Sequence, residues 1–437
     1  MATYVPNTKE QQLAMLDEIN KTFEDLIAPI PSNIRLNRPL NLPNGLSEFE
    51  ALDIMKDYAN QNTVFKTILR GAGAYVHYIP SVVKHLSARE EFVTAYTPYQ
   101  SELSQGILQS IFEYQTIMAD LTGMDAANAS VYDGATAVAE AITMCIERKQ
   151  HKILLADSLH PETIETIKAY NQYLDHPITI IPSKDGRVDL EALEEALDDE
   201  TACFVYQHPN YFGILENAEA IGELLSTSKA KLVAAVNPVS LAVLKNPKEN
   251  GVDIAVGEAQ PFGLAIAFGG PYLGFMATSD KLVRKLPGRI VGQTVDLEGT
   301  RAFALTLQAR EQHIRREKAL SSICSNQAHC ALIAGMYASA MGPQGLIEVA
   351  TSCYNNAHYF QEQLQSIGYD LTYQQPFFHE FVTKTPVLAK QIEKHLMKSN
   401  ILSGYPIDDY HMLWCTTEVV SKKTIDEVIS LLKEVQS

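Results

Sequence analysis

Short apolar runs alternate with amphipathic stretches through the middle of the chain. Five of these runs have the length of buried strands, and they are Ile153 to Ala156, Ile178 to Ile181, Cys203 to Tyr206, Leu232 to Val236 and Ile254 to Val256. Residues at helical spacing lie between them, at Pro161 to Tyr173, Leu190 to Leu197 and Ala218 to Leu225. Such alternation predicts an α/β fold with a mostly parallel central sheet and helices on both faces.

The flanking segments have a different pattern. Thr8 and Gln11 resemble a capping box, and the helical spacing that follows predicts a helical arm that ends at Pro29 and Pro31. After the core, a long helix is predicted at Gly345 to Ile367. The remaining predicted strands are Tyr369 to Tyr373, Glu380 to Thr383 and Met412 to Thr416, and the remaining predicted helices are Pro386 to Met397 and Lys423 to Val435. We therefore expect an N-terminal helical arm (1–65), a large α/β domain (66–342) and a small C-terminal α+β domain (343–437).

Composition indicates a globular protein with a large core. The chain has 437 residues, of which 46% are hydrophobic and 20% charged. Its net charge of −17 argues against nonspecific binding to nucleic acid or to anionic membranes, because both require basic patches. The most apolar late stretch, Cys324 to Met341, is interrupted by polar residues, which favours a buried helix over a membrane span. The N-terminus has no secretory signal pattern, so we expect a cytoplasmic location.

Metal and disulfide chemistry have little support in the sequence. The six cysteines are scattered without a CxxC pair, which is typical of free thiols in a reducing compartment. The twelve histidines include no HExxH motif. We therefore predict no metal site.

Two segments combine small residues with aromatic ones. Arg70 to His85 contains Tyr75, His77 and Tyr78, and Thr94 to Gly106 follows in the same style. Small residues let a backbone approach a ligand or partner closely, while aromatic residues wall the site. The alternative is that these tyrosines only pack a loop.

A third segment, Ser130 to Ala141, places Asp133, Gly134 and Thr136 where a loop enters a helix. Free amides at a helix N-terminus bind anions such as phosphate. Asp133 is also a common N-cap and repels phosphate, so the residues by themselves favour capping.

The most basic segment is Leu307 to Ala319, which contains Arg310, Arg315, Arg316 and Lys318. One interpretation is a solvated helix face with ion pairs at i to i+4 spacing. The other is a docking surface for an acidic partner.

Six segments of the chain together resemble one known family. They are GAGAYVHYIP, TAYTPYQSELSQG, LTGMDAANASVYDGATA, YQHPNYFG, FGGPYLGF and TLQAREQHIRREKA. In this order they closely resemble the P protein of the glycine cleavage system, and more narrowly its N-terminal half, which many bacteria make as a separate α subunit. The resemblance covers nearly the whole chain.

This resemblance implies a fold-type I pyridoxal-phosphate-dependent transferase-like fold. It also implies that the complex decarboxylates glycine and passes the aminomethyl group to the lipoyl group of H protein. In the family the β subunit carries pyridoxal phosphate on a lysine, and α pairs with β, which favours an α2β2 assembly. This chain is then predicted to hold no covalent cofactor and to be inactive in isolation.

Two positions bear on that expectation. Counting back from Gly269, Gly270 and Pro271, which resemble the glycine run after the β-subunit lysine, places Gln260 where the lysine would be. A carboxamide forms no imine. Asn237 falls where such enzymes place the aspartate that keeps the pyridine nitrogen protonated. We therefore predict no catalytic residue in this chain.

The remaining site predictions concern the subunit boundary, where fold-type I dimers build their active sites. By that analogy Tyr96 and Tyr99, and after them Tyr75 and His77, are expected to contribute to the αβ active site. Arg310, Arg315, Arg316 and Lys318 are the expected docking residues for H protein. Two alternatives stay open, namely a purely scaffolding or regulatory subunit and a stand-alone pyridoxal-phosphate enzyme that uses another lysine.

Overall fold

The computed structural model describes residues 7–95 and 98–436, and these fall into two compact units, Met1–Thr63 and Val64–Ser437. The first unit contains the helices α1 (Lys9–Glu18), α2 (Phe23–Ile27) and α3 (Glu48–Asn60), and none of the three buries a residue. The predicted capping box at Thr8 is present. A second capping box at Thr22 starts α2, so the predicted single arm helix consists of two.

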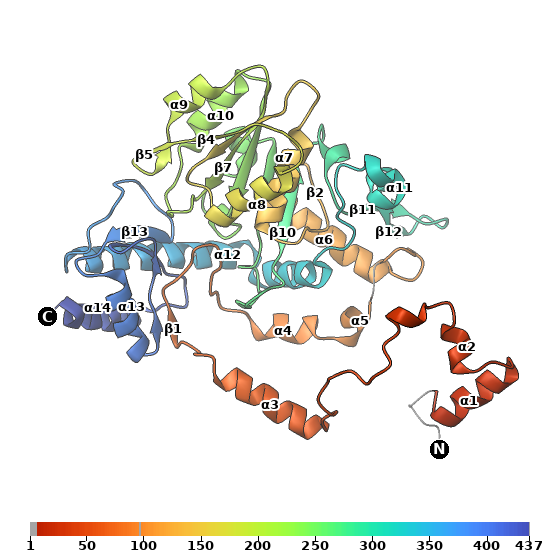
Figure 1. The fold of residues 1–437 in the computed structure, drawn as a ribbon. Helices are drawn as coiled ribbons and strands as arrows, with labels where there is room; N and C mark the ends of the chain where they lie inside the picture. The colour runs from red at the N-terminus through yellow and green to blue at the C-terminus, as the bar shows by residue number, and fades with distance from the viewer. Residues whose placement is uncertain (1–6, 96–97, 437) are drawn as a thin grey trace. The chain divides into compact units, whose positions relative to one another are not determined.

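The second unit is built on a seven-stranded sheet with the order β2-β10-β9-β8-β7-β3-β4 (Figure 1). The strands that the sequence predicted are β3 (Lys152–Ala156), β4 (Ile178–Ile181), β7 (Thr201–His208), β8 (Lys231–Val236) and β9 (Ile254–Glu258), and they pair in parallel. Only β10 (Gly274–Thr278) and β2 (Ala126–Ala127) run antiparallel to their neighbours. Nearly every residue of β3, β7 and β9 is buried, so both faces are covered. The predicted mostly parallel sheet is confirmed.

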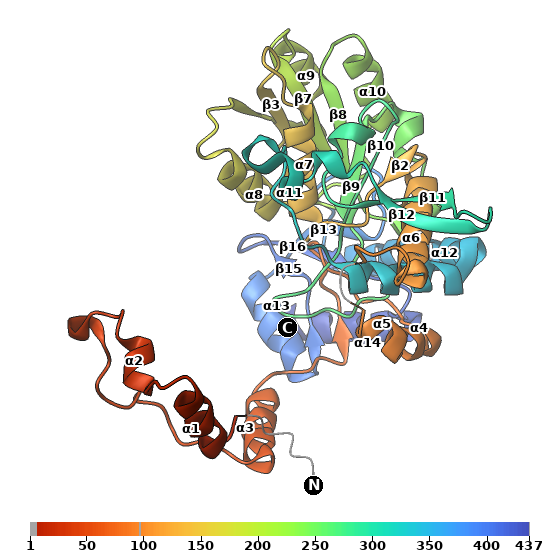
Figure 2. The same cartoon turned by 90° about the vertical axis from the view of Figure 1, so that its right-hand side faces the viewer.

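The helices that cover the sheet agree with the sequence pattern in the middle of the chain. They are α7 (Gly134–Cys145), α8 (Pro161–Asn171), α9 (Leu190–Ala196) and α10 (Ala218–Ser226). The pattern did not reveal α6 (Gln105–Thr122), which packs against β2 and β10, or the hairpin of β11 (Ile290–Val295) and β12 (Arg301–Thr306) beside it (Figure 2).

A long helix, α12 (Ala328–Gln365), packs against α6 and α4 (Ser81–Ser87). Among the described residues, it is the one helix long and apolar enough to span a membrane. The core helix of a soluble protein meets the same criteria of length and composition. Its residues Cys330, Ala334 and Tyr337 belong to the main apolar core, as expected for a buried helix. Gly342, with φ of 63°, interrupts the helical geometry next to Pro343.

The C-terminal residues have their own apolar cluster, centred on Trp414, Phe360 and Phe381. Its elements are β13 (Glu380–Lys384), β15 (Tyr405–Pro406), β16 (His411–Cys415), α13 (Ala389–Lys398) and α14 (Lys422–Gln436). The predicted strand at residues 369–373 is wrong, because only an isolated bridge joins Leu371 to Thr383 there. The division into three domains stays a prediction.

Candidate functional site at the carboxyl ends of the strands

A cavity of about 370 Å³ lies where the central parallel strands end. The residues at and just after the ends of β7, β8 and β9 line it, and they include Pro209, Asn237 and Glu258. The N-terminus of α7 and residues 72–75 complete the wall. Open α/β sheets place ligand sites at this edge because the loops diverge there. The cavity is therefore the candidate functional site.

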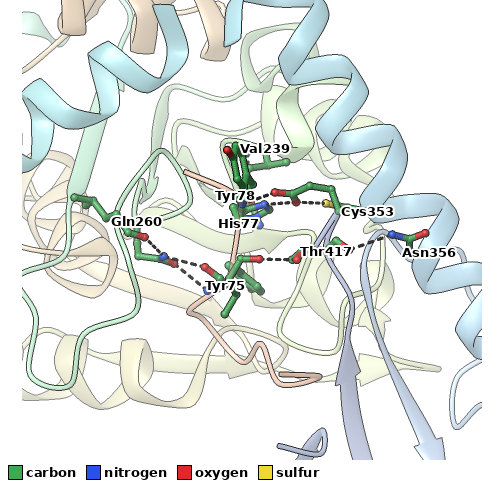
Figure 3. A network of polar contacts seen from close by, with 12 residues as sticks. Tyr75, His77, Tyr78, Val239, Gln260, Cys353, Asn356 and Thr417 are labelled. Atoms are coloured by element: carbon green, nitrogen blue, oxygen red, sulfur yellow. Dashed lines mark hydrogen bonds and ion pairs between the residues drawn. The ribbon is translucent and has the colours of Figure 1, made fainter. Parts of the chain in front are cut away.

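Gln260 is fully buried beside this cavity and makes three hydrogen bonds. Its Oε1 accepts from the Tyr75 backbone N–H at 2.9 Å, and its Nε2 donates to the Tyr75 carbonyl at 2.9 Å and to the Leu264 carbonyl at 2.7 Å. Figure 3 shows the side chain facing the Tyr75 backbone. Gln260 thus joins segment 72–78 to the loop after β9.

Asn237 lines the cavity in a fixed orientation. Its Oδ1 accepts from the Val239 backbone N–H at 2.9 Å, whereas its buried Nδ2 has no hydrogen-bond partner among the described residues. The group left available to a ligand is therefore a donor.

Glu258, at the end of β9, lies against the start of α7. Its Oε2 accepts from the Gly134 backbone N–H at 3.0 Å, and its Oε1 accepts from the N–H groups of Gln260 at 2.9 Å and Leu273 at 2.8 Å. Burial raises the pKa of Glu258 to about 7, although the three amides oppose that shift. Asp133 caps α7 by accepting from the Thr136 N–H at 2.8 Å, so the predicted capping role is confirmed.

Glu380 and His160 approach the cavity from distant parts of the sequence. The Glu380 carboxylate is buried and accepts from the Ala72 N–H and the Tyr75 hydroxyl, both at 2.7 Å. Burial raises its pKa to about 7. The His160 Nε2 lies 2.9 Å from the Ala72 carbonyl oxygen. Sequence reasoning missed Glu258, Glu380 and His160, and only Glu258 carried a signal, a carboxylate at the last position of a buried strand.

His77 belongs to a neighbouring polar network rather than to the cavity wall. Its Nδ1 lies 2.7 Å from Glu418 Oε2, and the Cys353 thiol donates to the same oxygen at 3.5 Å (Figure 3). Burial raises the pKa of Glu418, but its hydrogen bonds to His77 and Tyr78 outweigh that effect and lower it. These three side chains could together ligate a metal. Two donor atoms that bind one zinc ion lie about 3.3 Å apart. The 2.7 Å between His77 Nδ1 and Glu418 Oε2 is shorter, so these two atoms share a direct hydrogen bond in this structure.

The other predicted residues lie along a second region. Tyr99 is 56% exposed and its hydroxyl accepts from Arg289 at 2.5 Å; Tyr96 lies outside the described residues. Tyr99 and Arg316 line one cavity of about 400 Å³. Arg310, Arg315 and Lys318 line another of about 270 Å³, together with Arg284 and Lys285. The structure thus separates Tyr75 from Tyr99 and brings Tyr99 to the basic segment, which forms three short turns instead of one helix.

Comparison with known proteins decides the family. The glycine cleavage system P-protein family matches residues 2–432. The chain belongs to this P-protein family. It is 49% identical over 434 residues to the probable glycine dehydrogenase (decarboxylating) subunit 1 of Desulforamulus reducens, covering 97% of each chain. It is 48% identical to the protein of the same name from Desulfitobacterium hafniense, covering 99% of this chain and 100% of that one.

Solved structures agree with the P-protein assignment. An inhibitor-bound glycine decarboxylase (P-protein) of the glycine cleavage system has a TM-score of 0.93 and 39% identity, covering 99% of this chain and all of the other. The sphingosine-1-phosphate lyase of Burkholderia pseudomallei has a TM-score of 0.66 at 13% identity, covering 93% of this chain and 94% of the other, a likeness of fold alone. The predicted fold-type I pyridoxal-phosphate class is confirmed.

The cavity of this P-protein chain does not fit pyridoxal phosphate. No lysine is among its described lining residues, so no imine can form there. The unpaired atom of Asn237 is a donor, and its amide carries no negative charge to keep a pyridine nitrogen protonated. The α7 N-terminus, where a phosphate would bind, is already in contact with a carboxylate.

Proposed function

We propose that this chain is the cofactor-free α subunit of a two-subunit glycine decarboxylase. The complex decarboxylates glycine and transfers the remaining aminomethyl group to the lipoyl group of H protein. The observation that carries the proposal is Gln260, buried beside the cavity with both ends of its amide hydrogen-bonded. Gln260 takes the position of the Schiff-base lysine, and its amide stabilises the protein without forming a bond to a cofactor.

The partner is a β subunit that carries pyridoxal phosphate on its own lysine. The relatives' name, subunit 1, supports a second subunit, because it implies a complex of at least two chains. Asn237 takes the position of the aspartate that pairs with the pyridine nitrogen in cofactor-bearing chains, and its free donor supports the loss of that role. We propose an α2β2 assembly in the cytoplasm.

The α subunit contributes a surface to this assembly. Tyr99 and Arg316 line one cavity, and Arg315 and Lys318 line another formed by the same basic segment. On a chain of net charge −17, this local excess of positive charge favours an acidic partner. We propose that Arg310, Arg315, Arg316 and Lys318 dock H protein and that Tyr99, with Tyr96, shapes the entrance of the lipoyl arm. Tyr75, bonded to Glu380, and His77, bonded to Glu418, lie away from this surface and remain proposed contributors to the αβ active site.

Borohydride trapping of pyridoxal phosphate tests the assignment of the cofactor. The purified chain, its β subunit and their mixture are each reduced and the labelled lysine is located, while glycine-dependent carbon dioxide exchange is followed in parallel. We expect label on β only and exchange only in the mixture. Label on a lysine of this chain alone would show a stand-alone enzyme instead.

Substitution at the surface separates a working subunit from a scaffold. Arg316→Ala and Tyr99→Phe are compared in the reconstituted complex with Lys229→Ala, an exposed lysine of the loop before β8. We expect Arg316→Ala to raise the H-protein concentration for half-saturation about tenfold, and less so at high salt. Unchanged saturation by H protein in both variants, with an intact complex, would favour a purely scaffolding subunit.

A further inference from the structure

The start of α7 has the features of an anion site, but a side chain of the same protein fills it. The Gly134 N–H is one of the amides that have no partner inside the helix, and such amides carry partial positive charge. It donates to Glu258 Oε2 at 3.0 Å. The Thr136 amide, two residues further on, donates to Asp133 at 2.8 Å.

The Glu258 carboxylate is held from a second direction as well. Its other oxygen accepts from the backbone N–H groups of Gln260 and Leu273, which belong to the loop between β9 and β10. Three backbone amides from two separate segments therefore converge on one carboxylate. Converging backbone amides of this kind are the usual means by which proteins bind phosphate oxygens.

The rest of the cavity also disfavours an anion. Its described lining includes the carboxylates of Asp133, Glu162, Glu258 and Glu380 and contains no lysine or arginine. A phosphate that entered would displace Glu258 from its amides. It would then lie beside Asp133 and Glu162, and beside Glu258 and Glu380 wherever the pH exceeds their pKa values of about 7. Both effects oppose binding, because like charges in a partly buried site repel strongly.

We propose that Glu258 is a built-in anion that takes the place of a ligand phosphate at the N-terminus of α7, so that this cavity excludes phosphorylated ligands, pyridoxal phosphate included. This inference rests on the proposed function in one respect, which is that this chain carries no cofactor. It goes further because it names the group responsible: removing a lysine prevents the imine, whereas Glu258 prevents even noncovalent binding through the phosphate.

The test opens the anion site and asks whether phosphate enters. Full-length wild-type chain, Glu258→Ser and Glu140→Ser are titrated with inorganic phosphate and, separately, with pyridoxal 5′-phosphate, by calorimetry and by melting temperature. Glu140→Ser is the matched control. Glu140 is a buried carboxylate of α7, burial also raises its pKa to about 7, and it does not line the cavity.

We expect Glu258→Ser to bind phosphate at least about tenfold more tightly than the other two proteins, with a saturable rise in melting temperature that they lack. Pyridoxal 5′-phosphate is expected to compete with that phosphate. If Glu258→Ser folds only when phosphate is present, the proposal is supported. If it does not fold at all, Glu258→Ala decides, because its side chain neither pairs with the Gly134 N–H nor fills the space, and this variant must show the same phosphate-dependent rise in melting temperature.

Two results would overturn the inference. One is a folded Glu258→Ser or Glu258→Ala variant that binds phosphate no better than wild type. The other is wild-type chain that binds pyridoxal 5′-phosphate noncovalently as tightly as the serine variant. The first result leaves the proposed function intact, whereas label on a lysine of this chain after borohydride reduction would refute the proposed function and leave the role of Glu258 to be decided by the phosphate titration.

Discussion

Gln260→Ala is predicted to destabilise the protein through the backbone groups that it leaves unpaired. The Gln260 side chain is fully buried and is the hydrogen-bond partner of three backbone groups. The substitution leaves these three groups, the Tyr75 N–H, the Tyr75 carbonyl and the Leu264 carbonyl, without that partner. Each buried polar group left without a partner costs about 1–3 kcal/mol. Water entering the space left by the side chain offsets part of this, so we expect a loss of roughly 3–6 kcal/mol in the free energy of unfolding.

The chain contains a matched comparison for this magnitude. Gln115 is also buried, and its amide pairs with the N–H and carbonyl of Val291 at 2.9 and 3.0 Å. Gln115→Ala therefore unpairs two backbone groups instead of three, and a loss of roughly 2–4 kcal/mol follows. Gln344 is exposed, with one side-chain hydrogen bond to Glu348, and Gln344→Ala should stay within about 0.5 kcal/mol of wild type.

Melting temperature and hydrogen exchange measure the effect of Gln260→Ala. For a chain of this size about 2 °C or less corresponds to 1 kcal/mol, so we expect a decrease of roughly 5–10 °C. Exchange of the Tyr75 amide should accelerate in Gln260→Ala and not in Gln115→Ala. If Gln260→Ala melts within a degree of Gln344→Ala, Gln260 does not stabilise segment 72–78 and the reasoning is refuted.

The remaining predictions concern a buried carboxylate and a crowded glycine. Burial raises the folded-state pKa of Glu380 to about 7 from an ordinary value of 4.5, so this group costs wild type roughly 3 kcal/mol of stability as the pH rises from 4.5 to 7. Glu380→Gln cannot titrate, so its stability relative to wild type should rise by that amount over the same pH range. A melting-temperature difference between the two that does not grow over this pH range would contradict the assignment. Gly213 and Gly299 both have φ of 82°, but a Cβ at Gly213 would lie 1.9 Å from the Glu380 carbonyl oxygen and one at Gly299 would meet nothing within 4 Å. Gly299→Ala should therefore cost about 1–2 kcal/mol and Gly213→Ala at least about 3 kcal/mol, and equal chemical-denaturation midpoints would show that this contact does not matter.

The family likeness changes which experiments are informative. Activity measured on this chain alone would be expected to be absent under the proposed function, so stability and ligand binding are the properties that report on its own residues. The Glu258 and Gln260 variants give separate readings of the same cavity, one through anion binding and the other through melting temperature.

The sequence by itself determined the central sheet and the capping of α7. Runs such as Ile254 to Val256 are apolar at every position, and only strands covered on both faces need that pattern. Asp133 followed by Gly134 and Thr136 predicts an N-cap from local chemistry, since the cap and its N–H lie three residues apart. The helix α6 was missed although its buried residues Leu108, Ile111, Gln115, Met118 and Thr122 recur every three or four positions, which is a readable helical signal.

Only the tertiary structure decided what surrounds the cavity. Tyr75 and Glu380 are 305 residues apart in the chain, and Gly134 and Glu258 are 124 apart, yet each pair shares a hydrogen bond. No local pattern encodes such contacts, because they depend on which strand ends lie side by side at the edge of the sheet. The sequence revealed that position 260 lacks an amine; the fold decided that its amide binds the Tyr75 backbone and that the nearby Glu258 takes the amides where an anion would bind.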